Sequence, residues 1–406
     1  MAQRVISVRN RGFLFLDSHP AGCAELVQDM WTAVPALDPP AAPAAADAPV
    51  ALVIGCSAGY GLAATVAGLA RHGIRGVGVA FEKGPDRRTG TAGWYRTAAA
   101  DRLVRAHGHD FVFLNGDAFS DPVKDQVAEL LQDRFGGRLD YLVYSVAAPR
   151  RTDPDTGTVY SSVLKPIGGP SRTKTLAFDG ETGTEVTELE TQPAGDDEIA
   201  QTISVMGGDD WRRWIDHLGG RGLLADGFTT VALSYIGSPL TAALYREGTI
   251  GAAKQHLERT ARDLSAQLAE QVGGRALTSV NGAAVTQAST AIPGIALYVS
   301  LLREVLGDRM LSPIAQLTSL WDQLVDGRPP ATDDQGRVRL DTWELDPEVQ
   351  DAVAERWQKA DTDNIAELAD LAWFSTQVRQ LYGFAVPGID CAAPVEVDEP
   401  WPAAER

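Results

Sequence analysis

The stretch Ala51-Leu52-Val53-Ile54-Gly55-Cys56-Ser57-Ala58-Gly59-Tyr60-Gly61 decides the fold class of this chain. Its first four residues form an apolar run, which is typical of a strand buried on both faces. Three glycines in the next seven residues lead into a helical stretch around 62–71, so the backbone can turn sharply and approach a ligand closely. Free N–H groups at the start of such a helix bind a pyrophosphate. The stretch therefore predicts a dinucleotide-binding turn, with cofactor contacts from Gly55, Cys56, Ser57, Ala58, Gly59 and Tyr60. A turn that only packs the helix on the strand is the alternative for this motif alone.

An acidic residue stands where such a turn needs a partner. A second apolar run, at 76–81, ends beside Glu82, which lies 21 residues after Gly61. A carboxylate about 20 residues beyond the glycines holds the hydroxyls of the adenosine ribose and repels a 2′-phosphate. We therefore predict NADH rather than NADPH as the cofactor, with Phe81 and Glu82 among its contacts.

The same alternation continues along the chain. Apolar runs at 111–114, 141–144 and 229–235 are separated by helical stretches that include 93–106 and 123–135. Unbroken apolar strands that alternate with helices predict a doubly wound α/β fold around a parallel sheet. Two strand ends then face the same crevice: Asp117 and Ala118 near the adenine, and Val146 and Ala147 near the nicotinamide ribose. A purely structural turn is an equal alternative at both places.

Composition shifts divide the chain. Residues 38–49 are rich in Pro and Ala and predict a surface connector between an N-terminal arm, 1–37, and a single extended Rossmann-type domain, 50–406. Within that domain, 150–225 is polar and turn-rich and predicts a substrate-side insertion with a hairpin strand at 182–191. A long helix follows from Ile250 to Val272, and after Leu311 the chain is expected to be mostly helical, with a short strand at 338–340.

Composition and charge exclude several classes of function. The 406 residues hold 36 Lys and Arg against 54 Asp and Glu, a net charge of −18, which disfavours nucleic acid as a partner. Three separated cysteines form no disulfide framework, and the His107/His109 pair has no further ligand nearby, so no metal is expected. The sequence has no run of about 18 apolar residues, which predicts no membrane span, and the cytoplasm is the expected compartment.

The glycine turn also fits a second class of enzyme. Gly55-Cys56-Ser57-Ala58-Gly59 has the G-x-S-x-G pattern of a nucleophile elbow, which would make Ser57 the nucleophile of a serine hydrolase. Such an enzyme needs a downstream histidine, and only His217 and His256 follow His109. Both are expected on helices, in surface or core roles. The elbow also usually follows several strands, whereas this turn follows the first. The hydrolase stays an alternative here.

A tyrosine and a lysine stand nine residues apart, at Tyr245 and Lys254. In nicotinamide-dependent reductases a tyrosine hydroxyl can bond the substrate carbonyl while a lysine holds the ribose and lowers the pKa of the phenol. On an unbroken helix, a spacing of nine puts two side chains on opposite sides. The pair can converge only if Tyr245 precedes the helix and the chain turns near Gly248, with Thr249 as the N-cap. The bare spacing is common and carries little by itself.

At this point the sequence resembles the FabV-type trans-2-enoyl-ACP/CoA reductases (the trans-2-enoyl-CoA reductase family), whose mark is Tyr-x8-Lys. The resemblance runs along nearly the whole chain in ordered blocks. Besides the glycine turn, these blocks are Arg11-Gly12-Phe13, His19-Pro20-Ala21-Gly22-Cys23, Phe81-Glu82-Lys83, residues 88–95, Asn115-Gly116-Asp117-Ala118-Phe119-Ser120, residues 149–154, Met206-Gly207-Gly208, Ser234-Tyr235-Ile236-Gly237, residues 285–289 and Trp343-Glu344-Leu345.

The resemblance implies roles by position. Tyr245 would be the catalytic tyrosine and Lys254 its partner, which also binds the cofactor, while Tyr235 would be a second, substrate-binding tyrosine. Val285 and Thr286 would contact the nicotinamide end, and the segment that follows them, up to residue 302, would border the acyl pocket. The family fold is an extended Rossmann unit with added substrate-side helices, usually monomeric.

The implied reaction is NADH-dependent reduction of the C2–C3 double bond of a trans-2-enoyl thioester, in fatty acid synthesis or related acyl metabolism. Its carrier is CoA or acyl carrier protein. A non-catalytic nucleotide-binding protein of the same fold is the third interpretation, disfavoured because Tyr245 and Lys254 are both present. One departure stands out: Ala242-Ala243 replace the Trp-Pro that usually precedes the family tyrosine, and this predicts a roomier acyl pocket.

Overall fold

Seven parallel strands form the central sheet of the computed structural model, which describes residues 3–34, 48–178, 184–326 and 330–403. The strand order confirms the predicted doubly wound α/β fold. Across the sheet it runs β14 (Arg337–Arg339), β13 (Arg275–Val280), β12 (Leu224–Ser234), β7 (Leu139–Tyr144), β4 (Val50–Ile54), β5 (Arg75–Ala80) and β6 (Phe111–Asn115).

The first strand, β4, lies at the centre and pairs with both β5 and β7. From β4 the chain adds strands first toward β6 and then, after crossing back, toward β14. Where the winding reverses, between β4 and β7, the connections leave a crevice at the carboxyl ends of the strands. All five residues of β4 are fully buried, as its unbroken apolar run requires.

Helices cover both faces of the sheet. One face packs against α1 (Pro20–Ala33), α2 (Gly59–His72), α3 (Ala92–Ala106) and α9 (Pro313–Val325). The other face packs against α4 (Asp121–Arg134), α6 (Asp209–Gly220) and α7 (Thr249–Val272). The layers hold because each helix turns a buried apolar stripe to the sheet. In the first layer, Trp321 packs on Gly68 and donates its indole N–H to the Ala64 carbonyl at 2.7 Å.

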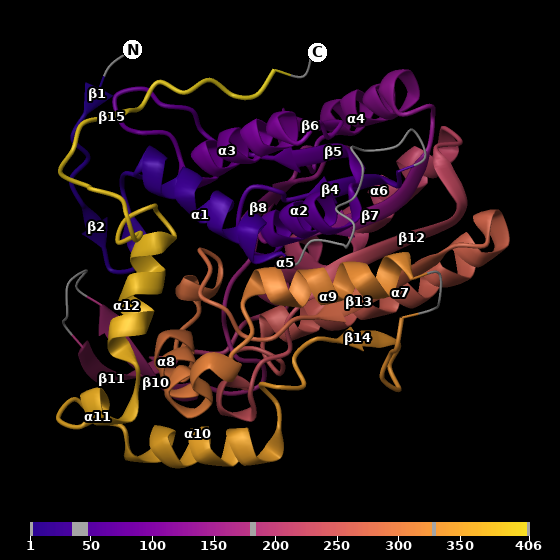
Figure 1. Ribbon diagram of the computed structural model, residues 1–406. Helices are drawn as coiled ribbons and strands as arrows, with labels where there is room; N and C mark the ends of the chain where they lie inside the picture. The colour runs from indigo at the N-terminus through magenta and orange to yellow at the C-terminus, as the bar shows by residue number, and fades with distance from the viewer. Residues whose placement is uncertain (1–2, 35–47, 179–183, 327–329, 404–406) are drawn as a thin grey trace.

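The described part of the N-terminal arm lies against the rest of the fold. Strand β1 (Gln3–Arg4) pairs with β15 (Val395–Glu396) near the C-terminus, so the two ends of the chain lie on the same side of the molecule (Figure 1). A short hairpin, β2 (Asn10–Arg11) with β3 (Leu14–Phe15), precedes α1. Most of the predicted connector, 38–47, lies outside the described residues. The domain boundaries stay a prediction.

The predicted insertion, 150–225, begins with two antiparallel hairpins. These are β8 (Arg150–Thr152) with β9 (Val159–Ser161), and β10 (Ser171–Phe178) with β11 (Thr184–Thr191). The second contains the strand expected at 182–191, whose first two residues lie outside the described ranges. Helix α5 (Asp196–Met206) follows. Helix α6 belongs to the sheet-covering layer, and β12 begins at Leu224, with a register shift before Thr229.

A second core lies beyond the carboxyl edge of the sheet. It gathers α8 (Ile295–Leu306), α10 (Pro347–Lys359), α11 (Ile365–Leu368) and α12 (Leu371–Gln380) with the hairpin β10–β11, which lie together at the lower left of Figure 1. Three short 3₁₀ turns lie in nearby connections: η1 (Pro239–Thr241) between β12 and α7, η2 (Ser289–Ala291) before α8, and η3 (Gly307–Arg309) after α8. None of the helices in the described ranges has the length and apolar character that a membrane span requires.

Candidate active site

Two adjoining cavities run along the carboxyl edge of the sheet. One, of about 400 Å³, lies over the ends of β4, β5 and β6. The other, of about 540 Å³, lies between the ends of β7 and β12 and the helices α7 and α8. They share a wall made of Tyr60, Ser145–Pro149 and Thr286–Ala288, so a ligand that fills the first can reach into the second.

The glycine turn builds the floor of the smaller cavity. Gly55 has φ +88°, and a Cβ there would lie 2.1 Å from the Ser145 carbonyl oxygen. A Cβ on Gly61 would lie 1.9 Å from the Gly55 carbonyl oxygen. Any side chain at these positions would therefore displace the backbone. The start of α2, at Gly59 and Tyr60, lines the cavity, and a helix N-terminus of this kind can bind a pyrophosphate.

Most of the predicted cofactor residues line this cavity, but Cys56 does not. Its side chain is 1% exposed and packs beneath Gly78, and its N–H donates to the Val79 carbonyl at 3.1 Å. Neither group is left for a ligand. The predicted cofactor residues that line the smaller cavity are Gly55, Ser57, Ala58, Gly59, Tyr60, Phe81, Glu82, Asp117, Ala118, Val146, Ala147 and Thr286. The glycine motif therefore predicted the turn correctly. The burial of the Cys56 side chain depends instead on its packing against the core beneath the turn.

The carboxylate of Glu82 is held at the edge of the same cavity. Ser57 donates its hydroxyl to Glu82 Oε1 at 2.6 Å, and the Thr91 hydroxyl donates to Oε2. The backbone of Glu82 is fixed by Asn115, which accepts from its N–H at 2.8 Å and donates to its carbonyl at 2.9 Å. Thr91 and Asn115 lie in matched family blocks, but sequence reasoning gave them no role.

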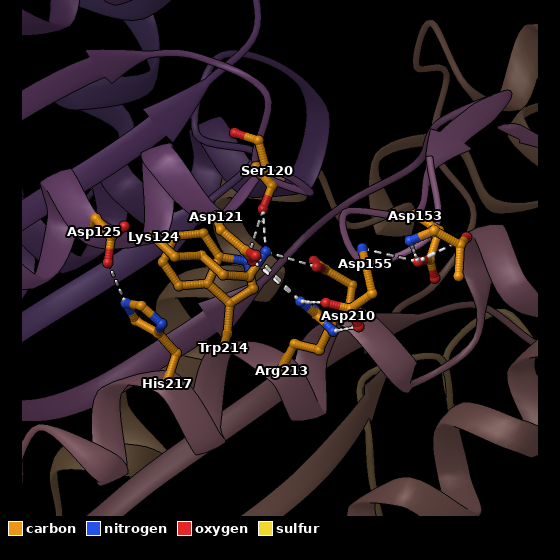
Figure 2. Close-up of polar contacts among 12 residues, drawn as sticks. Ser120, Asp121, Lys124, Asp125, Asp153, Asp155, Asp210, Arg213, Trp214 and His217 are labelled. Carbon is orange, nitrogen blue, oxygen red and sulfur yellow. Dashed lines mark hydrogen bonds and ion pairs between the residues drawn. The ribbon is translucent and has the colours of Figure 1, made fainter. Parts of the chain in front are cut away.

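Ser57 has no catalytic base beside it. The Ser57 hydroxyl donates a hydrogen bond to Glu82, and no histidine is among the residues that line the two cavities. His217 Nε2 lies 3.4 Å from Asp125 on the outer layer of helices (Figure 2), and His256 Nδ1 accepts from the Gly208 N–H at 3.0 Å. The serine-hydrolase alternative is therefore wrong, because both downstream histidines are engaged elsewhere.

The Asp117–Ala118 loop is held from behind by buried polar groups. The Ala118 carbonyl accepts from Lys124 Nζ at 2.8 Å and from the indole N–H of Trp214 at 3.1 Å. Lys124 is also paired with Asp210 at 2.9 Å, and both side chains are almost completely buried (Figure 2). Because Asp210 is on α6 and Lys124 on α4, this pair ties the second helical layer to the predicted adenine loop.

Tyr245 and Lys254 converge because the chain breaks between them. Tyr245 lies in the turn after η1, where its N–H donates to the Thr241 carbonyl at 3.0 Å. Helix α7 begins at Thr249 with Gly248 as its N-cap, so the prediction that Thr249 is the cap is wrong by one residue. The Thr249 hydroxyl instead accepts from the Lys165 N–H at 3.3 Å.

Both side chains, together with Tyr235, line the larger cavity. Tyr245 is 7% and Lys254 8% exposed. Burial raises the pKa of Tyr245 far above its ordinary range, so the phenol stays protonated. Burial lowers the pKa of Lys254 to about 8, partly opposed by Glu258. The Tyr235 and Tyr245 rings meet edge to face, with centroids 5.1 Å apart.

The segment expected at the nicotinamide and acyl end is only partly placed there. Thr286 lines both cavities, whereas Val285 lines neither and packs into the second core. Farther along, Ile292, Ile295 and Val299 line the larger cavity. Residues 242–243 are not part of its wall, since Ala242 is half-buried and Ala243 is exposed to solvent. The roomier acyl pocket expected from these two alanines stays a prediction.

A buried carboxylate beside the site was missed by sequence reasoning. Glu344 is 0% exposed and accepts hydrogen bonds from the hydroxyls of Tyr235 and Tyr298, at 2.7 and 2.8 Å. Burial raises its pKa to about 7, against the opposing effect of the two phenols. Glu344 lies in the matched family block Trp343-Glu344-Leu345, but a charged residue in a loop carries no local sign that it will be buried.

Together, the parallel sheet, the glycine turn with Glu82, and the Tyr245–Lys254 pair in an adjoining cavity define a nicotinamide-dependent oxidoreductase of the Rossmann class. The comparisons with known proteins identify its family. Residues 5–87 match the "NAD(P)H binding domain of trans-2-enoyl-CoA reductase" and residues 88–325 the "Trans-2-enoyl-CoA reductase catalytic region". The chain belongs to the trans-2-enoyl-CoA reductase family, as the resemblance predicted.

Relatives and solved structures agree along the whole chain. The chain is 58% identical over 392 residues to the "Enoyl-[acyl-carrier-protein] reductase [NADH]" of Streptomyces avermitilis, covering 97% of this chain and 98% of that protein. It superposes on the trans-2-enoyl-CoA reductase of Treponema denticola, in complex with NAD, with TM-score 0.88 and 41% identity. For the Clostridium acetobutulicum enzyme, in complex with NADH, the values are 0.89 and 34%. Each structural match covers 97% of this chain and 98% of the other.

A third match, over residues 332–395, is described as "Enoyl reductase FAD binding domain". The structure describes this whole segment, and none of its residues lines either cavity. Its helices instead bury apolar side chains such as Trp357 and Phe374 in the second core against α8. Because the segment is packed as a core and lines neither cavity, its residues do not fit a flavin.

Proposed function

We propose that this chain reduces the C2–C3 double bond of trans-2-enoyl thioesters with NADH, with Tyr245 as the hydrogen-bond donor to the thioester oxygen and Lys254 as its cationic partner. One observation carries the proposal. Tyr245 and Lys254 line a single cavity that shares a wall with the cavity of the glycine turn and Glu82. A cofactor held in one would therefore face a substrate held in the other.

The chain offers a complete cradle for NADH. The start of α2 would hold the pyrophosphate, and Glu82, fixed by Ser57 and Thr91, would accept the ribose hydroxyls and repel a 2′-phosphate. The small residues at 145–148 leave room for the nicotinamide end at the shared wall. When bound, NADH supplies a hydride to the β-carbon of the substrate.

The residues of the larger cavity match the charge that then develops. Addition at the β-carbon moves negative charge onto the thioester oxygen. The Tyr245 hydroxyl stays protonated and donates to that oxygen, in a buried site where such a bond is strong. Lys254 is a cation below about pH 8 and would bind the ribose while stabilising negative charge near the phenol. Uptake of one proton from solvent at the α-carbon completes the saturated acyl thioester.

The wall of the larger cavity suits an acyl chain. Apolar side chains contributed by several elements, Leu164, Met206, Ile250, Ile292, Ile295 and Val299, surround the space beyond Tyr245. We propose that both CoA and acyl carrier protein thioesters serve as substrates, as the names of the Treponema and Streptomyces relatives suggest. Because one chain completes both cavities, we propose a monomer, and we propose that it acts in the cytoplasm, the compartment expected from the sequence.

The test is the loss of reduced-nicotinamide absorbance with crotonyl-CoA, in parallel with NADH and NADPH. We expect turnover that prefers NADH, and Tyr245→Phe should lower kcat by about 10²–10³-fold while NADH still binds. A protein that does not bind NADH would refute the proposal. A Tyr245→Phe variant with near wild-type turnover would refute the role of Tyr245 alone.

A further inference from the structure

A carboxylate without a cation lies behind the substrate cavity. Glu344 Oε1 accepts from the hydroxyls of Tyr235 and Tyr298, at 2.7 and 2.8 Å, and Oε2 accepts from the Ala283 N–H at 2.5 Å. Among its hydrogen-bond and ion-pair partners in the described ranges there is no Lys, Arg or His. Burying an unpaired carboxylate is unfavourable, so its position needs an explanation beyond packing.

A hydrogen-bond network fixes the Glu344 carboxylate. It reaches Tyr235 itself and, through Gln350, the segment just before Tyr245. Gln350 donates to the Tyr298 hydroxyl at 3.0 Å and to the Glu344 carbonyl at 2.8 Å. Gln350 also accepts from the hydroxyl of Ser238 at 2.6 Å, and Ser238 is the N-cap of η1, directly before the turn of Tyr245. The segment 332–395 thus contributes this network to the site rather than a flavin.

The direction of these hydrogen bonds gives Tyr235 and Tyr245 different roles toward a ligand in the cavity. A phenol has one proton, and that of Tyr235 is donated to Glu344, so Tyr235 can offer the cavity only an acceptor oxygen. No described residue accepts a hydrogen bond from the Tyr245 hydroxyl, which leaves its proton for a ligand. The two rings touch, and both line the same cavity.

We propose that Glu344 is a positioning residue that holds the Tyr235 proton away from the substrate and so leaves Tyr245 as the one phenol that donates to the thioester oxygen. This inference rests on the proposed function and deepens it. The titratable groups near Glu344 are the phenols of Tyr60, Tyr235, Tyr245 and Tyr298 and the carboxylate of Asp341, which accepts from Arg339 at 2.7 Å.

Replacing the carboxylate by an amide should reverse the direction of the bonds. In Glu344→Gln the Ala283 N–H still demands an acceptor, so the amide oxygen turns to it and the NH₂ group turns to the two phenol oxygens. The Tyr235 proton is then released into the cavity. Tyr235 then becomes a second hydrogen-bond donor to the thioester oxygen. Its effect on kcat should be measurable in a variant whose residue 245 cannot donate.

The experiment compares kcat with crotonyl-CoA and NADH for wild type, Y245F, Y245F/E344Q and Y245F/E344Q/Y235F. We expect Y245F to lose about 10²–10³-fold, Y245F/E344Q to regain at least about tenfold, and the triple variant to fall back to Y245F. Y245F/Y298F is the matched control, because it removes the second phenol from Glu344 without releasing the Tyr235 proton. It should restore nothing. NADH affinity and thermal unfolding check that each variant folds.

A double variant as inactive as Y245F that still binds NADH would overturn the proposal, and so would a triple variant that keeps the gain. If Y245F/E344Q does not fold, the pH profile of Y245F decides instead. The residual kcat of Y245F should rise as the pH falls through about 7, where Glu344 takes up a proton. Adding Y235F to that variant should abolish the rise. A flat profile overturns the proposal. Absence of wild-type turnover would instead refute the proposed function.

Discussion

At the scale of single residues, the choice of cofactor depends on the Glu82 carboxylate, which Ser57 and Thr91 hold at the edge of the smaller cavity. We predict that Glu82→Gln narrows the preference for NADH over NADPH by at least about tenfold in kcat/KM, because the amide no longer repels a 2′-phosphate. Thr91→Val is the control, since it removes one donor and keeps the charge. An unchanged cofactor preference in Glu82→Gln would contradict this role.

Lys254 gives the second prediction at this scale. Burial holds its pKa at about 8, so the side chain is a cation below that pH and neutral above it. We therefore expect kcat/KM for NADH to fall as the pH rises through about 8, since this parameter reports the free enzyme. Lys254→Met should have low activity throughout and lack this fall. A fall of the same size in Lys254→Met would assign it to another group.

At the scale of elements, the buried Lys124–Asp210 pair joins α4 to α6 behind the predicted adenine loop (Figure 2). Asp210→Asn would leave the buried ammonium of Lys124 without its charge partner. We predict a loss of about 3 kcal/mol in the free energy of unfolding and weaker NADH binding, because Lys124 also holds the Ala118 carbonyl. Denaturant unfolding and NADH titration measure the two effects.

Two further variants serve as comparisons for the stability loss predicted for Asp210→Asn. Replacing the pair together, as Lys124→Met with Asp210→Leu, should recover most of the stability, because a buried pair gains little over an apolar one. Arg213→Ala on the same helix removes the ion pairs to Asp121 and Asp155, and it should cost less than about 1 kcal/mol because those partners are exposed. Equal losses in Asp210→Asn and Arg213→Ala would contradict the reasoning.

At the scale of the whole molecule, the second core supports the active site by packing and does not bind a cofactor of its own. Helices α10 and α12 pack into that core, and residues 332–395 do not line either cavity. We predict that the purified protein shows no flavin absorbance and that added FAD does not raise its turnover with NADH. A stoichiometric flavin, or turnover that depends on FAD, would contradict this view of the segment.

Much of the fold followed from local pattern. Buried parallel strands read as short apolar runs because neither of their faces meets water, so β4, β5, β6, β7 and β12 were predicted, and the short β14 as well. Strand β13 was not predicted. The glycine turn was predictable because steric contacts at Gly55 and Gly61 admit no side chain. The break before α7 was predicted from helix geometry, although the cap fell on Gly248 rather than Thr249.

The sequence by itself therefore determined the sheet, the dinucleotide turn with its carboxylate, and, through the Tyr-x8-Lys resemblance, the family. Only the tertiary structure decided that Cys56 turns into the core, that Val285 lies outside the cavity wall, and that Glu344 accepts hydrogen bonds from two tyrosines. The reason is separation along the chain. Glu344 meets Tyr298, Ala283 and Tyr235 across 46, 61 and 109 residues, and no local pattern encodes contacts that form only when two cores pack together.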